Sequence, residues 1–560
     1  MDSLESIKNC LDTGKSFILE AGAGSGKTWT LIESLKYIIE KNGRDLERRS
    51  KRIACITYTN VAKDEISERI DNNPLVLVST IHEFLWFTIK HYQKELKLEI
   101  IQANHASAKG PIPELDSIIE KVTIEYSQYG RNFEKGQLTH EDIIEFSHRI
   151  FLKYPKICGI VTQQFPYIFV DEYQDTEPRT VEILLNGLLK PKTGYFILGF
   201  FGDFMQKIYN QGVGKIQSEQ LQVITKKENY RCSRKVIDLL SLIRPDLKQE
   251  PAGANKEGEI TFITCQTPQN NDFEKTVQYL TASRKWDIEN NGKILFLTHK
   301  GIAQKLGYEN LLSCYGILPF GRDRLLSKEE RFCDFFLNKV EMVVRSYANK
   351  NFPEMIRLLG SNGTRINSHA DKKQIDTLIR NLIEIRKTAS VKAVLDFVVS
   401  SKLMAKPQRL IDFEFEIQRA DLDEKGETKK KFYESLIKIP YQEFITINEF
   451  IDDFTPYSTK HGVKGAEFDN VLVVIDDSSW NQFKFNDVFA NNLKNAERFN
   501  RTLNLLYVCC SRAKDKLTIL SLSSMDSKAM ATIIQWFKSE NVIDASDLPL
   551  ASPSVARQST

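Results

Sequence analysis

The sequence has no cysteine arrangement typical of a metal site. Its nine cysteines form no CxxC motif and no cluster with histidine, which argues against a zinc finger or an iron–sulfur cluster. An odd number of cysteines without a spacing pattern also suits a reducing compartment better than a disulfide-stabilised secreted fold.

Long hydrophobic runs and a strong net charge are missing too. No apolar stretch approaches the roughly 20 residues of a transmembrane helix, and the start, MDSLESIKNC, lacks the layout of a signal peptide. We therefore expect a soluble, cytoplasmic protein with no membrane partner. The net charge is only +3, so a nucleic-acid partner would require basic residues gathered on one surface, which composition does not locate.

The pattern of apolar runs predicts an α/β protein. A chain of 560 residues is too long for one compact domain. Strand-like runs lie at 16–20, 54–59, 167–172 and 195–200, with helical periodicity over 28–41 after the first. A second set follows residue 226, at 259–264, 293–299, 470–476 and 516–522. Near-continuous apolar strands alternating with helices predict two domains with parallel sheets.

Two mainly helical stretches interrupt these patterns and are interpreted as insertions. They cover residues 80–145 and 336–445. We therefore predict a first domain over 1–79 and 146–225, and a second over 226–335 and 446–540. The last residues, 541–560, are rich in Ser, Pro and Ala and are expected to be disordered.

A glycine-rich turn joins the first predicted strand to its helix. It reads Ala21-Gly22-Ala23-Gly24-Ser25-Gly26-Lys27-Thr28 and closely follows a P-loop, with Ala21 where the strict pattern has Gly. Gly24 and Gly26 would let the backbone turn its N–H groups towards phosphate oxygens. Lys27 would reach the β and γ phosphates, and the Thr28 hydroxyl would bind Mg²⁺. The strand before and the helix after argue against a chance glycine-rich turn.

A P-loop requires a carboxylate on a second strand. Asp171 and Glu172 follow the apolar run Ile168–Val170. Asp171 is the expected Mg²⁺ ligand, and Glu172 would orient or deprotonate the attacking water. Two acids at a strand end can also be simple solvated groups, but the P-loop favours the catalytic interpretation.

The residues around this pair carry a family resemblance. Residues 171–176 read DEYQDT, which resembles the signature of the UvrD/Rep/PcrA-like superfamily 1 DNA helicases. Further motifs similar to those of the family follow in its order: TYTNVA at 57–62, STIHEF at 79–84, GDFMQKIY at 202–209, NYRCS at 229–233, TKHGVKGAEF at 459–468 and LYVCCSRAK at 506–514. The resemblance covers residues 21 to 514. It implies two RecA-like domains, each with an insertion, and ATP bound between them.

The resemblance also implies roles for residues that match the motifs. Gln206 would sense the γ phosphate, and Arg231 and Arg512 would reach the same phosphate from the second domain. An arginine there neutralises charge in the transition state. Tyr230 would stack on the adenine, or else be a core aromatic residue, and Glu467 would bond the ribose.

A second group of motif residues would contact single-stranded DNA. Tyr58 and Tyr209 stand where the family places side chains on bases, and stacking suits a motor because every base has a π face. The residues that would bond phosphates or sugars are Thr59, Thr80, His82, Thr459 and His461. The two histidines could instead be core or capping residues. The basic residues of 44–52, expected in a loop, and of 429–431 are better interpreted as solvated surface than as duplex contacts.

The chain departs from the family pattern in places. No Gln precedes the P-loop, which leaves the choice of ATP over GTP open, and Asn210–Val213 replaces the usual Trp-Arg-Gly element. The compact build is similar to the helicase subunits of phage-defence systems such as Gabija, which work with a separate nuclease.

Two functions remain open. The first is an ATP-driven 3′-to-5′ helicase on single-stranded or 3′-tailed DNA, acting in phage defence or DNA repair. The second is a DNA-gated ATPase switch that senses DNA ends and activates a partner nuclease with little unwinding. A P-loop kinase or GTPase would explain neither the second α/β domain nor Arg512.

Overall fold

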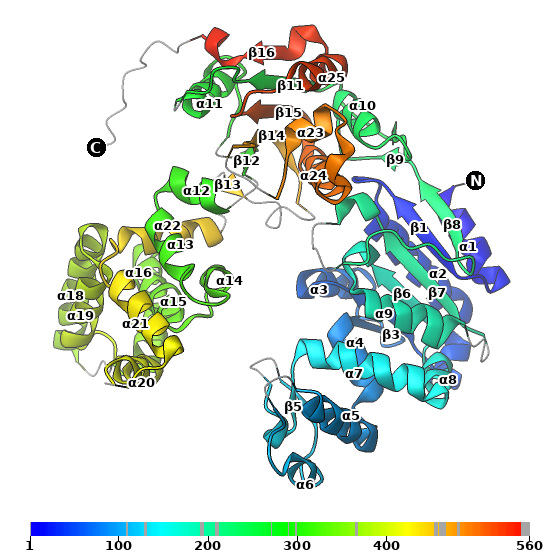
Figure 1. Cartoon of the computed structure of the whole chain (residues 1–560), viewed down its shortest axis with the longest axis horizontal. Helices are drawn as coiled ribbons and strands as arrows, with labels where there is room; N and C mark the ends of the chain where they lie inside the picture. The colour runs from blue at the N-terminus through cyan, green and yellow to red at the C-terminus, as the bar shows by residue number, and fades with distance from the viewer. Residues whose placement is uncertain are drawn as a thin grey trace. The chain divides into compact units, whose positions relative to one another are not determined.

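A computed structural model gives the fold (Figure 1). It divides into two compact units, described separately below: Met1–Tyr279 with Gly465–Val471 and Asp476–Thr560, and Leu280–Lys464 with Leu472–Ile475. The structure describes residues 2–107, 110–127, 131–190, 195–207, 212–269, 271–288, 290–296, 299–364, 368–419, 421–452, 457–458, 466–478 and 482–549.

The first unit contains a six-stranded parallel sheet. Its strands, in spatial order, are β3 (Val76–Thr80), β2 (Ile53–Thr57), β6 (Tyr167–Asp171), β7 (Ile197–Gly202), β1 (Phe17–Ala21) and β8 (Gln222–Lys226). Alternate side chains enter two separate hydrophobic cores: Ile18 and Ile168 lie in one, Phe17 and Phe169 in the other. Burial on both faces explains the near-continuous apolar runs, so the parallel α/β prediction is confirmed.

The helix after the P-loop is longer than the sequence pattern indicated. α2 runs over Lys27–Arg48, so the expectation of a basic loop from residue 44 was wrong for its first residues. Leu46 is buried in the core and fixes the last turn. Asp45 pairs with Arg48 at 2.7 Å and with Arg49 at 3.0 Å. Such pairs three and four residues apart stabilise a helix.

The first helical insertion packs directly on the sheet. It comprises α4 (Ile81–Ile89), α5 (Gln93–His105), α6 (Leu115–Ile119) and α7 (His140–Lys153), and α8 (Pro155–Gln164) follows. A short parallel pair, β4 (Glu125–Tyr126) with β5 (Gln137–Leu138), lies among them. Phe84 and Phe146 belong to the same core cluster as the strand residues Ile18 and Ile168. α7 continues through residue 145, where the sequence pattern placed a boundary.

A second parallel sheet lies in the same unit. β11 (Glu259–Thr264) is flanked by β15 (Ala513–Ser521) and β16 (Val542–Asp544). The helices α10 (Arg234–Ile243), α24 (Ala496–Cys510) and α25 (Ser527–Phe537) pack against it. β16 lies in the segment expected to be disordered, so that expectation was wrong up to residue 549. Leu548 is buried, which explains why this segment is ordered.

The second unit is mainly helical. Its core includes an aromatic cluster in which Phe336 lies 5.3 Å from Tyr441 and 5.0 Å from Phe444, measured between ring centroids. β12 (Gly292–Phe296) pairs in parallel with β13 (Tyr457–Ser458), and β14 (Phe468–Ile475) has residues in both units. The helices are α12 (His299–Leu306), α13 (Glu309–Tyr315), α14 (Gly321–Leu326), α15 (Arg331–Phe335), α16 (Glu341–Ala348), α17 (Phe352–Ser361), α18 (His369–Thr388), α19 (Val391–Ser400), α20 (Gln408–Ile417), α21 (Glu424–Leu436) and α22 (Gln442–Ile451).

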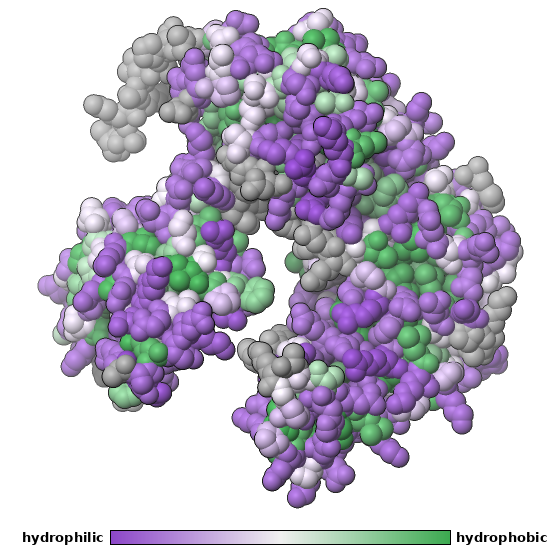
Figure 2. Space-filling model, viewed as in Figure 1, coloured by the Kyte–Doolittle hydropathy of each residue, from purple (hydrophilic) through white to green (hydrophobic). Residues whose placement is uncertain are grey.

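The surface agrees with a fold whose apolar residues are mostly interior. The visible face carries mainly hydrophilic residues, with hydrophobic ones in separate patches (Figure 2). Among the described residues, no helix combines the length and apolar character required to span a bilayer.

Candidate nucleotide and nucleic-acid site

The turn between β1 and α2 has the backbone of a phosphate-binding loop. Gly24 and Gly26 have φ of 71° and 79°, in the left-handed region that favours glycine. A Cβ on Gly24 would also lie 2.7 Å from the Cβ of Arg231. No larger residue fits there, which explains the glycine spacing seen in the sequence.

Two donors in this loop have no hydrogen-bond partner among the described residues. They are the buried Nζ of Lys27 and the buried Oγ of Ser25. The Lys27 Nζ lies 3.6 Å from Glu172 Oε1, which is an ion pair and longer than a hydrogen bond. Buried donors without partners are rare in proteins, and phosphate oxygens would satisfy both.

The carboxylates expected to support Mg²⁺ lie at the end of β6. Asp171 is buried and accepts a 3.0 Å hydrogen bond from the backbone N–H of Glu172. Glu172 has φ of 49°, an uncommon conformation for a non-glycine residue that often occurs at functional sites. Gln174 donates to the Glu172 carboxylate. Glu172 is therefore held in one orientation towards Lys27.

The donor set fits a metal held together with a nucleotide. The described residues contain no group of three or more His, Cys, Asp or Glu that could hold a metal ion. Mg²⁺ is usually bound by one or two protein groups with substrate phosphates. Thr28, in the first turn of α2, and Asp171 match that requirement, and their assignment as ligands remains a prediction.

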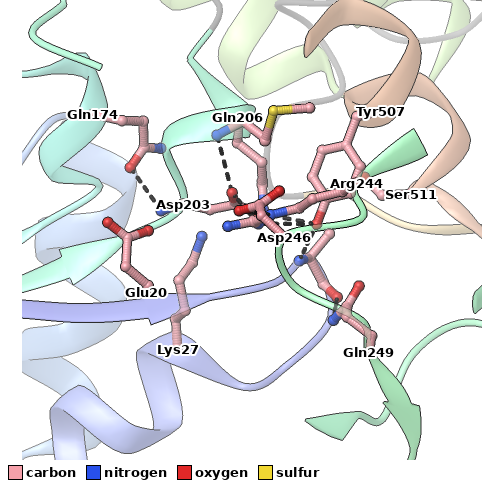
Figure 3. A network of polar contacts seen from close by, with 12 residues as sticks. Glu20, Lys27, Gln174, Asp203, Gln206, Arg244, Asp246, Gln249, Tyr507 and Ser511 are labelled. Carbon is pink, nitrogen blue, oxygen red and sulfur yellow. Dashed lines mark hydrogen bonds and ion pairs between the residues drawn. The ribbon is translucent and has the colours of Figure 1, made fainter. Parts of the chain in front are cut away.

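The predicted sensor and one predicted arginine meet directly. Arg512 donates from Nη2 to Gln206 Oε1 at 3.2 Å, and the Gln206 amide donates to Asp203 Oδ2 at 2.9 Å (Figure 3). Arg512 is 1% exposed. Burial and then the positive charge of Arg231 lower the pKa of Arg512 to about 10. The guanidinium thus remains charged near neutral pH and lies close to the second predicted arginine.

Arg231 lines a cavity of about 550 Å³. Its Nε donates to Glu467 Oε2 at 2.7 Å. Tyr230 also lines the cavity and is 60% exposed, so it is not a core aromatic residue. The remaining lining residues are Gly24, Ser25, Gly26, Trp29 and Glu467.

Trp29 was not among the residues predicted from the sequence. Its side chain is 51% exposed and lines the same cavity as Tyr230. The sequence feature that could have indicated a role in the nucleotide site is its position directly after Thr28, in the first turn of α2. The structure thus places two aromatic side chains around the cavity beside the P-loop.

The described DNA-contact candidates lie at helix starts near the ends of β2 and β3. Tyr58 is 40% exposed. Thr59 caps α3 (Asn60–Arg69) by accepting from Ala62 N at 3.2 Å. Thr80 caps α4 in a capping box with Glu83. Both threonines therefore have a structural role that the sequence interpretation did not include.

His82 lies in the first turn of α4 beside a second histidine. Its ring centroid is 4.5 Å from that of His140. Burial, and then the charge of His140, lower the pKa of His82 to about 4, so His82 is neutral at neutral pH. With Tyr58 and Asp171 it lines a cavity of about 710 Å³. The candidates Tyr209, Thr459 and His461 lie outside the described residues.

Comparison with known proteins shows similarity to UvrD-like helicases. Residues 4–110 and 101–218 match the family model of the UvrD/REP helicase N-terminal domain. The chain is 26% identical to the Gabija protein GajB of Bacillus cereus (strain HuB5-5), over 93% of this chain and 95% of GajB. It is 25% identical to the ATP-dependent DNA helicase PcrA of Staphylococcus aureus (strain Mu50 / ATCC 700699), over 43% of this chain and 40% of PcrA. The chain is therefore similar to UvrD/PcrA-like helicases, and the match to the UvrD/REP helicase N-terminal domain lies within residues 4–218.

Proposed function

We propose that this protein is an ATP-dependent DNA helicase or translocase that moves 3′ to 5′ along single-stranded DNA. The observation that carries the proposal is the contact between Arg512 and Gln206 beside the P-loop. Arg512 lies next to the second parallel sheet, and Gln206, the predicted γ-phosphate sensor, follows the last residues of β7 in the first sheet. An arginine so placed would make hydrolysis depend on how the two sheets approach each other.

The P-loop side would bind the nucleotide and start the reaction. Lys27 and Ser25 would donate to phosphate oxygens, because both have buried donors without hydrogen-bond partners among the described residues. Thr28 and Asp171 would hold Mg²⁺, which neutralises charge on the phosphates. Glu172 would accept the proton of the attacking water.

The opposite side of the cavity would respond to nucleotide binding. Arg231 and Glu467 pair with each other at 2.7 Å, although the family resemblance assigns them to a phosphate and to the ribose. ATP binding would replace this pair with two separate contacts. A nucleotide would thus reorganise the residues that join the two sheets, as a motor requires.

DNA binding is proposed along the cavity that contains Tyr58 and His82. Tyr58 would stack on a base, and the neutral His82 would bond a phosphate or sugar without adding charge. Thr59, Thr80, Tyr209, Thr459 and His461 are proposed as further contacts from the family motifs.

Similarity to GajB over most of both chains favours phage defence over DNA repair as the pathway. It also favours a separate nuclease as a partner.

The polarity is tested by strand separation. With ATP and Mg²⁺, the protein should open a duplex with a 3′ single-stranded tail and leave a 5′-tailed duplex closed. Lys27→Ala should abolish opening, because it removes the phosphate-binding ammonium group. Opening of the 5′-tailed duplex alone would contradict the proposed direction.

The alternative is a DNA-gated ATPase switch that activates a partner nuclease. The similarity to GajB favours it, as does the replacement of the family's Trp-Arg-Gly element by Asn210–Val213. Strong stimulation of ATP hydrolysis by single-stranded DNA, with neither duplex opened, would decide for this alternative.

A further inference from the structure

A buried carboxylate connects the sensor glutamine to the helices of the second sheet. Asp203 follows β7 and is completely buried. Its Oδ1 accepts from the Met205 backbone N–H at 3.1 Å and from Arg244 Nη1 at 2.5 Å. Its Oδ2 accepts from Gln206 Nε2 at 2.9 Å and from the Tyr507 hydroxyl at 3.2 Å. These contacts form the centre of the network in Figure 3.

Arg244 is the counter-ion of this carboxylate. It is the C-cap residue directly after α10 and is almost fully buried. Its guanidinium carbon lies 4.9 Å from the ring centroid of Phe204. A buried charge that loses its partner is strongly unfavourable. The Asp203 carboxylate can therefore remain ionised in this position only while it is paired with Arg244. No motif that led to the family resemblance includes Arg244.

The Tyr507 hydroxyl connects the same carboxylate to the P-loop. It accepts from the backbone N–H of Ala23 at 3.0 Å and donates to Asp203. Arg244 Nη1 lies 3.5 Å from it. Tyr507 belongs to α24, five residues before Arg512. One hydroxyl therefore joins the phosphate-binding loop, the end of β7 and the helix that leads to Arg512.

The network fixes the direction of the Gln206 amide. Its nitrogen donates to Asp203, and its oxygen accepts from Arg512. A reversed amide would direct N–H groups at the arginine. Asp203 thus determines the orientation of the Gln206 amide, while Arg244 and Tyr507 hold the Asp203 carboxylate in position.

We propose that Arg244 and Tyr507 are positioning residues for ATP hydrolysis, holding Gln206 against Arg512 and both against the P-loop. This inference rests on the proposed ATPase function. Neither residue lines the nucleotide cavity. Losing either contact should therefore leave nucleotide binding nearly intact and misplace the groups that act on the phosphate. Such a defect lowers kcat more than it raises KM.

Tyr507→Phe is the decisive variant because it removes only the hydroxyl. We expect kcat for DNA-stimulated ATP hydrolysis to fall about tenfold, the effect of losing a hydrogen bond to a charged group. The KM for ATP should change less than about twofold. Tyr308→Phe is the matched control. Tyr308 is also fully buried, but its hydroxyl has no hydrogen-bond partner among the described residues, so kcat should be unchanged.

Two variants of Arg244 separate positioning from folding. Arg244→Lys retains a positive charge for Asp203 and should recover part of the kcat that Arg244→Met loses. Thermal unfolding of each variant shows whether the fold persists, and Tyr507→Phe remains informative if Arg244→Met does not fold. If Tyr507→Phe matches the wild type and Tyr308→Phe, the positioning role is wrong while the proposed function stands. If the wild type shows no DNA-dependent hydrolysis, the proposed function is wrong and the positioning role with it.

Discussion

Two exposed aromatic side chains distinguish the cavity beside the P-loop. Trp29 and Tyr230 both line it and are more than half exposed, although large aromatic residues usually bury most of their surface. Stacking of a flat ligand on such rings would explain why they are exposed in its absence. The P-loop would place phosphates at one end of the cavity, so the base of the nucleotide would lie between or against these rings.

Replacement of Trp29 should weaken ATP binding rather than stop hydrolysis. Aromatic stacking on a base contributes about 1–3 kcal/mol, so Trp29→Ala should raise the KM for ATP by about tenfold or more. Trp29→Phe retains a ring and should stay near the wild type. Steady-state kinetics at saturating DNA measures both values, and an unchanged KM in Trp29→Ala would exclude the stacking role.

Lys27 and Asp171 could be proposed from the sequence because Lys27 begins α2 and Asp171 ends β6, each beside an apolar run. The structure brings Lys27, Glu172, Gln206 and Arg512 into one region, although they are up to 485 residues apart. Arg244 and Trp29 were missed for a physical reason: the ion pair of Arg244 with Asp203, and the cavity that Trp29 shares with Tyr230, exist only in three dimensions. A single arginine at a helix end has no local pattern that separates it from a surface residue.

The secondary structure was predictable where burial is continuous. The strands β1, β6 and β11 coincide with long apolar runs in the sequence. β8 and β3 were missed because they are partly exposed and carry a mixed pattern, as in Gln222–Lys226. β16 was missed because it has three residues and, in the described part of the chain, pairs with β11 alone. Short strands are specified by their neighbours more than by their own residues.

The start of α4 links stability to the proposed DNA surface. Thr80 Oγ1 accepts from the Glu83 N–H at 3.4 Å, and the Glu83 carboxylate accepts from the Thr80 N–H at 2.9 Å. Thr80→Ala should therefore destabilise the first unit by about 1 kcal/mol, the usual value of an N-cap. Thr80→Ser retains the cap and should be neutral. Urea unfolding followed by far-UV circular dichroism measures both, and equal midpoints for Thr80→Ala and the wild type would contradict the capping role.

At the level of the whole protein, the proposed motor would link hydrolysis to movement along DNA through a few contacts among the described residues. Arg512 belongs to the chain that leads from α24 into β15, yet it donates to Gln206 of the first sheet. Tyr507 makes a parallel connection to Ala23. Because these contacts join residues beside the two parallel sheets, a change at the bound nucleotide would alter both at once. This arrangement allows a small local event to be transmitted through rigid elements.

Loss of the Arg512 guanidinium should therefore stop the motor without unfolding it. Arg512→Ala should lower DNA-stimulated kcat by roughly 10³-fold, the low end for an arginine that stabilises phosphoryl transfer. Arg501, on the preceding helix α24, pairs with Glu497, and Arg501→Ala should retain activity as the control. DNA-stimulated turnover that persists in Arg512→Ala would remove the basis of the motor proposal.

Arg512→Lys should behave differently because of its surroundings. The burial and the Arg231 charge that lower the pKa of Arg512 to about 10 would act equally on a lysine, whose ordinary pKa is about 10.4. That lysine would lose its proton within the range where the wild type stays charged. Its kcat relative to the wild type should therefore rise as the assay pH falls from about 9 to about 7. A ratio that is constant across this range would show that charge on residue 512 is not what hydrolysis requires.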